Sequence, residues 1–235
     1  MQNCVIASTS TIHGSDPLEY LFEVLLELFH NSDEILFIPY ACPGGISHNE
    51  YTTTINNIFK KINKRVLGID MFSSPEESFK NTQGIFTGGG NTFLLVDQLY
   101  RNNVLKPLKI AINSGTPYLG TSAGSNICGL TMQTTNDMPI IHPSSYKTLG
   151  IFPFNINAHY LDPNPNSTHK GETRETRIKE FHTINPQPVV GLREGSWLRI
   201  DKNDIVLQGK LSARIFEKNK TPYEINPNSS LVALN

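Results

Sequence analysis

One pentapeptide, Gly120-Thr-Ser122-Ala-Gly124, constrains the fold of this chain strongly. It lies between a short apolar run typical of a strand and residues 123–128, which are expected to begin a helix. A serine on so tight a turn needs very small residues two positions before and after it, and the two glycines supply them. The pattern predicts a nucleophile elbow, in which helix amides favour negative charge beside Ser122. An ordinary turn with a serine cap is the alternative.

The chain around this motif alternates strands with helices. The expected strands cover residues 4–8, 34–40, 66–72, 84–87 and 117–119. The first helix is expected to begin at the cap Ser15-Asp16-Pro17 and to run to about His30. Later helices carry apolar residues at helical spacing, at positions 55, 58 and 62 and at 93, 94, 96 and 99. The alternation predicts an α/β fold: a mostly parallel sheet with helices on both faces, and ligands at the carboxyl ends of its strands.

A second glycine-rich loop, Gly88-Gly89-Gly90-Asn91, occupies the same position in the preceding strand-helix unit. Its amides are therefore expected to reach the same pocket as the elbow. We expect the N–H groups of Gly90 and Ala123 to form an oxyanion hole. A phosphate cradle or a plain turn is the alternative, but the loop lacks the Gly-x-Gly-x-x-Gly spacing and a following Lys-Ser/Thr.

A serine nucleophile needs a base, and His159 is the strongest of the seven histidines because it follows a strand-like stretch, residues 150–158. The other six are expected to be solvated surface residues: His13, His30, His48, His142, His169 and His182. A carboxylate should orient the imidazole. Glu194 follows a short strand and precedes a glycine, and Asp137 is the rival candidate. The order Ser, His, Glu differs from the order in α/β-hydrolases.

Length and charge narrow the class of protein. A chain of 235 residues is a normal size for one α/β domain, and we expect a single domain over residues 1–235. The formal net charge is −1 with both signs mixed along the chain. Nucleic-acid binders usually carry a basic patch, so a small-molecule partner is expected instead.

The cysteines and the apolar stretches bear on location. Cys4, Cys42 and Cys128 are widely spaced and show no disulfide or zinc-ligand pattern, so no metal or other cofactor is expected. The most apolar stretch, residues 20–29, is interrupted by Glu23 and Glu27, and the N-terminus lacks a leader pattern. We expect a soluble cytoplasmic protein with no membrane partner.

Several motifs together resemble one family. They are Gly88-Gly-Gly-Asn-Thr-Phe93, Gly120-Thr-Ser-Ala-Gly124, Thr134-Thr-Asn-Asp-Met-Pro-Ile140, Asn157-Ala-His159, Gly171-Glu-Thr-Arg-Glu175 and Arg193-Glu-Gly195. In this order they resemble peptidase E, the cytoplasmic aspartyl dipeptidases, related in fold to class I glutamine amidotransferase domains. Thr121 stands where a bulky aromatic is common, and Ala158 where proline is common. The resemblance implies a flavodoxin-like or amidotransferase-like sheet with extra strands near the C-terminus.

The resemblance also implies the roles of individual residues. Ser122 would be the nucleophile, His159 the general base and then acid, and Glu194 the carboxylate that orients the imidazole, with Gly90 and Ala123 as the oxyanion donors. The expected substrate is a small peptide with an N-terminal aspartate, cleaved by a monomer or homodimer.

A substrate carboxylate held in a pocket needs a positive, planar donor such as arginine. Arg174 is the first candidate, and Arg177 and Arg193 are the second. Asp137 is the candidate for the substrate ammonium.

Three other functions remain open. A cyanophycinase-like peptidase that acts on aspartate-linked units is the nearest. A glutaminase-type amidotransferase would normally have cysteine at the position of Ser122. A binding module without catalysis would be expected to lack a triad member.

Overall fold

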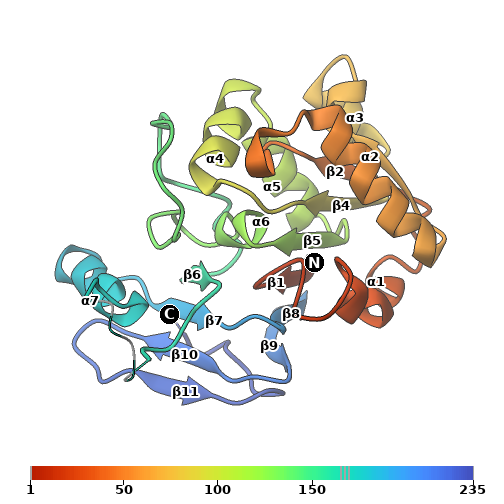
Figure 1. Ribbon diagram of the computed structural model, residues 1–235. Coiled ribbons are helices and arrows are strands. Elements are labelled where there is room, and N and C mark those ends of the chain that lie inside the picture. The colour runs from red at the N-terminus through yellow and green to blue at the C-terminus, as the bar shows by residue number, and fades with distance from the viewer. Residues whose placement is uncertain (1, 165, 167, 169, 235) are drawn as a thin grey trace.

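Two β-sheets form the framework of the computed structural model, which describes residues 2–164, 166, 168 and 170–234 (Figure 1). The larger sheet has seven strands in the order β3-β2-β4-β5-β1-β8-β9. These strands are β1 (Gln2–Ala7), β2 (Glu34–Ile38), β3 (Arg65–Gly68), β4 (Gly84–Thr87), β5 (Tyr118–Thr121), β8 (Ser196–Lys202) and β9 (Asp204–Gly209). The first five run parallel, and β8 and β9 extend the sheet as antiparallel strands. The expected α/β fold with additional C-terminal strands is confirmed.

Helices cover both faces of this sheet. Side chains alternate along a strand, so Cys4 and Ile6 join one apolar cluster while Val5 and Ala7 join the other. The helices α1 (Phe22–Leu28) and α2 (His48–Phe59) pack on the face of Val5. The helices α4 (Thr92–Arg101), α5 (Leu105–Asn113) and α6 (Ala123–Asn126) pack on the face of Cys4.

Short helical segments complete the connections of the larger sheet. They are η1 (Glu19–Leu21), η2 (Pro43–Gly45), η3 (Lys60–Ile62), η4 (Ile69–Met71) and α3 (Pro75–Lys80). Ser47 and Ser74 cap α2 and α3, each accepting a hydrogen bond from the backbone N–H three residues on.

Two helices differ from the expectation. The first begins at η1 and Phe22 rather than at Ser15, because Leu18 is buried in a left-handed conformation, with φ of 62°, and its N–H donates to Ser10 O. The elbow helix ends after four residues, at Asn126. It stops there because the carbonyls of residues 127–129 accept hydrogen bonds from residues 149–151 instead of continuing the helix.

Strand-like stretches were expected before His159 and Glu194, but the sequence did not predict that they form a second, smaller sheet. It consists of β6 (Asn155–Ala158), β7 (Val189–Leu192), β10 (Ala213–Phe216) and β11 (Tyr223–Ile225) in the order β11-β10-β7-β6, and α7 (Arg174–Ile184) precedes β7. In Figure 1 it lies below the larger sheet, at the blue end of the chain. Strands β6 and β7 pair in parallel, so Ala158 lies opposite Leu192.

Buried apolar residues connect the two sheets. Val190 and Ile215 of the smaller sheet belong to the same cluster as Ile6 and Ile200 of the larger sheet. This shared core supports the single domain over residues 1–235, which stays a prediction. Within the described ranges, no helix has both the length and the apolar character needed to cross a bilayer.

Candidate active site

Ser122 lies on a sharp turn between β5 and α6. Its backbone has φ of 52° and ψ of −110°, a conformation that is rare for a residue with a side chain. The N–H of Ser122 donates to Ala7 O, and its carbonyl accepts from Ser125 N and Asn126 N. Hydrogen bonds of both its N–H and its carbonyl thus stabilise the strained turn that a nucleophile elbow requires.

The glycine after the serine allows α6 to approach the sheet. A Cβ added to Gly124 would lie 2.1 Å from Thr87 O at the end of β4. No side chain fits in that space, so the small residue predicted from the pattern is a packing requirement here.

Ser122, His159 and Glu194 form one hydrogen-bonded chain. Ser122 Oγ lies 2.8 Å from His159 Nε2, and His159 Nδ1 lies 2.7 Å from Glu194 Oε1. When the proton of the ring is on Nδ1, the serine hydroxyl donates to Nε2 and Nδ1–H donates to the carboxylate. The side chains of His159 and Glu194 are 39% and 53% exposed, so solvent reaches this pair. The three residues predicted from the sequence therefore meet in the geometry of a nucleophile, a base and an orienting carboxylate.

The smaller sheet brings the imidazole and the carboxylate together. His159 and Arg193 directly follow the paired residues Ala158 and Leu192, and Glu194 comes next. Arg193 stabilises this loop through hydrogen bonds. Its guanidinium donates to Asp162 and Glu224 carboxylates at 2.8 to 3.0 Å and to Ser212 O at 2.7 Å.

These contacts change the pKa of a carboxylate beside Arg193. Hydrogen bonds from Arg193 and Ser212 lower the pKa of Glu224 to about 2, against the effect of burial. A guanidinium so fully bonded has little capacity left for a substrate, which argues against Arg193 as the anchor.

Ser8 is a residue of the site that the sequence reasoning missed. Its buried hydroxyl accepts a hydrogen bond from His159 N at 2.9 Å and donates to Leu192 O at 2.7 Å. The preceding residue, Ala7, accepts from Ser122 N. The end of β1 therefore contacts the segments that carry all three side chains of the hydrogen-bonded chain. The available signal was a hydroxyl residue at the carboxyl end of the first predicted strand.

The glycine loop 88–90 lies against the serine. A Cβ added to Gly89 would be 3.1 Å from Ser122 Cβ. Gly90 has φ of 136°, and a Cβ there would meet Ala41 O at 2.3 Å, so only glycine fits. Tyr51, which the sequence analysis did not single out, donates its hydroxyl to Gly89 O at 3.0 Å. The N–H groups of Gly90 and Ala123 donate no turn or loop hydrogen bond within the described part of the chain.

Asp137 does not contact His159 and so does not act as its orienting acid. One of its oxygens, Oδ2, accepts hydrogen bonds from Thr92 N at 2.7 Å, Thr92 Oγ1 at 2.5 Å and Thr135 Oγ1 at 3.0 Å. These bonds place the carboxylate at the start of α4, next to the glycine loop. No hydrogen bond from another described residue reaches Oδ1, so that oxygen is available to a ligand.

Arg174, at the first position of α7, is half-buried. Burial and the neighbouring Arg177 lower the pKa of its guanidinium, and Asp137 acts in the opposite direction. No carboxylate among the described residues forms an ion pair with Arg174. Arg177 instead lies on the exposed side of α7, 3.8 Å from Glu172. Of the three candidate arginines, Arg174 is therefore the half-buried one that forms no ion pair with a described carboxylate.

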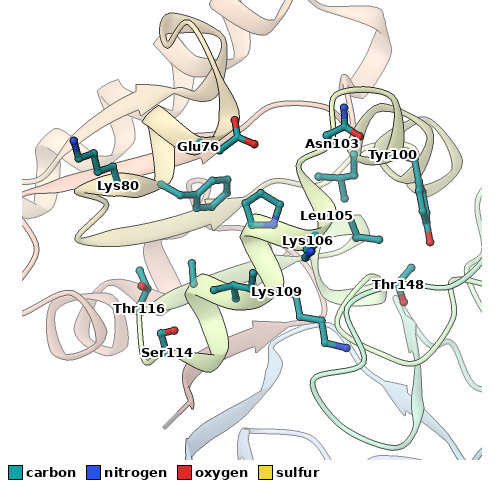
Figure 2. Close-up of a pocket in the computed structure, with 15 residues that line it drawn as sticks. Glu76, Lys80, Tyr100, Asn103, Leu105, Lys106, Lys109, Ser114, Thr116 and Thr148 are labelled. Carbon is teal, nitrogen blue, oxygen red and sulfur yellow. The ribbon is translucent and has the colours of Figure 1, made fainter.

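A cavity of about 340 Å³ adjoins the serine and the imidazole, which both line it. A larger cavity of about 910 Å³ lies between α3, α4 and α5 (Figure 2). Thr116, which lines the larger cavity, precedes the amino end of β5, whereas Ser122 follows the carboxyl end of that strand. The larger cavity thus belongs to the opposite end of the sheet.

The other histidines that the structure describes take no part in this arrangement. His182, expected at the surface, is buried, and its Nε2 lies 3.0 Å from Gln187 O because α7 packs this face on the smaller sheet. His169 lies outside the described residues. Among the residues that are described, no group of three or more His, Cys, Asp or Glu side chains could hold a metal ion.

Comparison with known proteins agrees with this geometry. Residues 4–208 match the model of peptidase family S51. The chain is 41% identical over 232 residues to peptidase E of Streptomyces coelicolor, covering 99% of this chain and 94% of that protein. It is 38% identical over 236 residues to the Drosophila melanogaster protein named "Probable alpha-aspartyl dipeptidase", covering 99% and 97%.

A solved structure shares the fold. The crystal structure of a peptidase from an acI-B1 actinobacterium superposes with a TM-score of 0.71 at 16% identity, covering 98% of this chain and 96% of that one. The family match extends over most of the chain and includes the elbow, the glycine loop and the segments of His159 and Glu194. The chain therefore belongs to peptidase family S51 and is a hydrolase that acts on peptides.

Proposed function

We propose that this protein is a serine-type dipeptidase that removes an N-terminal aspartate through an acyl-enzyme. The observation that carries the proposal is the continuous hydrogen-bonded chain from Ser122 Oγ through His159 to Glu194. A serine hydroxyl at its ordinary pKa is a weak nucleophile, so it needs an adjacent base that is held in place by a third group. All three are present at the elbow.

Each proton transfer has a donor and an acceptor in the site. As Ser122 Oγ attacks the peptide carbonyl, its proton passes to His159 Nε2, and Glu194 stabilises the imidazolium. The N–H groups of Gly90 and Ala123 donate to the carbonyl oxygen as it becomes negative. The proton on His159 then passes to the leaving amine as the C–N bond breaks. Water, deprotonated by the same imidazole, releases aspartate and restores the serine.

The substrate assignment draws on the relatives and on two charged groups. The relatives carry the names peptidase E and alpha-aspartyl dipeptidase. Arg174 provides a half-buried guanidinium without a carboxylate partner among the described residues. Asp137 provides Oδ1 for a substrate ammonium, since its hydrogen bonds go to Oδ2. A guanidinium near a carboxylate suits a substrate that carries both charges at its N-terminal residue.

A cytoplasmic location fits the state of the cysteines. All three are free thiols, and burial raises the pKa of the Cys4 thiol to about 12. We infer a reducing compartment, where such thiols persist.

Hydrolysis of a small peptide panel tests the function. We expect Asp-Leu to be cleaved, Asn-Leu and Glu-Leu to be cleaved much more slowly, and acetyl-Asp-Leu to be left intact because it has no ammonium for Asp137. Ser122→Ala should fold normally and lose roughly a million-fold in turnover. Activity within about tenfold of the wild type in Ser122→Ala would exclude the acyl-enzyme. Faster cleavage of isoaspartyl-Leu than of Asp-Leu would favour a cyanophycinase-like function instead.

A further inference from the structure

The cavity beside Ser122 lies on one particular face of the larger sheet. Four of its walls, Leu18, Tyr51, Ile55 and Phe86, belong to the apolar cluster under α1 and α2. No Lys, Arg, Asp or Glu occurs among the described residues that line it. A charged side chain placed there would lose its hydration without gaining a partner.

Two charged groups of the site, Asp137 and Arg174, are placed by their contacts with the other face of the sheet. Asp137 is bonded to Thr92 at the start of α4, and α4 packs on the opposite apolar cluster, through Leu95 and Val96. Arg174 is near enough to Asp137 for the two charges to interact. Ser122 lines the apolar cavity, whereas Asp137 is bonded at the start of α4, a helix that packs on the opposite face of the sheet.

A peptide bond under attack must lie across the serine, with the acylated residue on one side and the leaving residue on the other. His159, which must protonate the leaving nitrogen, itself lines the cavity. We propose that the cavity is the binding pocket for the leaving residue and that it selects an apolar side chain at that position. The proposal rests on the proposed function, because the aspartate must occupy the side of Arg174 and Asp137.

The volume of the cavity agrees with this assignment. About 340 Å³ lies at the lower end of the range for ligand pockets, which suits one large side chain. The walls include residues of α2, of the loop before η1 and of the end of β4. Leucine, methionine and phenylalanine are the leaving residues that such walls favour.

Dipeptides that differ only in the leaving residue test the proposal on the wild-type protein. We expect kcat/KM for Asp-Leu to exceed that for Asp-Gly by roughly ten- to a hundredfold, since burying an apolar side chain typically contributes that much. Asp-Glu and Asp-Lys should also fall well below Asp-Leu. Equal kcat/KM for all four would overturn the inference.

Two neighbouring threonines on α2 offer a matched pair of variants. Both are exposed, but Thr54 lines the cavity and Thr53 does not. Thr54→Lys should lower the ratio of kcat/KM for Asp-Leu to that for Asp-Glu by roughly tenfold, because a cation then faces the leaving residue. Thr53→Lys should leave the ratio within about twofold. An equal change in both variants, or no change in either, would contradict the pocket.

Failure of this inference is distinct from failure of the proposed function. If Asp-Leu, Asp-Gly and Asp-Glu are all cleaved at similar rates, the dipeptidase assignment stands and only the pocket assignment fails. If no dipeptide with an N-terminal aspartate is cleaved, the proposed function fails and the pocket assignment fails with it.

Discussion

The hydroxyl of Ser8 accepts a hydrogen bond from the backbone N–H of His159 at 2.9 Å. His159 adopts a positive φ of 54° at this point, a conformation that few residues with side chains hold without support. The same hydroxyl donates to Leu192 O at 2.7 Å, two residues before Glu194. One buried group therefore fixes the loops of the base and of the carboxylate relative to each other.

Ser8→Ala should both slow catalysis and weaken the fold. The change leaves the N–H of His159 without its partner, which typically costs about 1–3 kcal/mol of stability. Because a misplaced imidazole no longer faces Ser122, we expect kcat to fall by roughly ten- to a hundredfold with KM changed only a few-fold. Steady-state kinetics and urea unfolding of the purified variant measure the two effects.

Ser32→Ala is the matched control. Its hydroxyl is also buried and donates to a backbone carbonyl, Gln83 O, away from the site. We expect a loss of stability without a loss of kcat in the folded protein. If Ser8→Ala and Ser32→Ala show the same kcat once both are folded, Ser8 has no positioning role.

Substitutions of Glu194 and of Asp137 should affect different kinetic parameters. Glu194→Gln removes the charge that stabilises the imidazolium, so turnover of Asp-Leu should fall by roughly a thousandfold or more. Asp137→Asn should mainly raise KM, because it weakens the contact to the substrate ammonium. A large loss of turnover in Asp137→Asn with normal turnover in Glu194→Gln would reverse the two assignments.

Arg174→Met should change substrate preference rather than activity in general. Leaving a substrate carboxylate without its partner typically costs about 2–5 kcal/mol, so kcat/KM for Asp-Leu should fall by roughly 30-fold to several thousandfold. Asn-Leu, which brings no side-chain charge, should lose far less. Arg177→Met, one turn further along α7 and exposed, is the control and should keep the ratio of the two substrates. An unchanged preference for Asp over Asn in Arg174→Met would rule this arginine out.

Acid should lower the stability of the fold because the Glu224 carboxylate becomes protonated. Its carboxylate is bonded to Arg193, and these bonds hold its pKa at about 2 in the folded chain, against about 4.3 for an unfolded glutamate. The folded pKa is the lower one, so this stabilisation is complete above about pH 5 and is lost as pH falls from there to about 2. The side chain is 36% exposed, and we therefore expect only about 1 kcal/mol after solvent screening.

Urea unfolding at several pH values measures the contribution of Glu224. Glu224→Gln should lower the free energy of unfolding at pH 7 and flatten its fall between about pH 5 and pH 2. Parallel curves for the wild type and the variant over that window would show that Glu224 does not contribute.

The alternation of strands and helices was readable from the sequence because each parallel strand is a short apolar run and each helix buries a periodic face. The first helix was placed too early, since the cap at Ser15 is a local signal whereas the burial of Leu18 is a tertiary effect. Strand-like stretches were expected before His159 and Glu194, but their pairing in a separate sheet escaped prediction because strand pairing depends on contacts between distant parts of the chain.

The sequence by itself indicated the elbow and the glycine loop, because Gly90 adopts a positive φ and Gly124 leaves a space that no side chain could occupy. It also indicated His159 and Glu194 by their positions after short strands. Only the tertiary structure decided that these two side chains meet and that Ser8 joins their loops. It also decided that Arg193 binds a carboxylate of the protein itself. Those contacts join residues 31 to 184 positions apart. The pairing of β6 with β7 and the packing at the end of β1 create them, and no local pattern in the chain encodes such pairings.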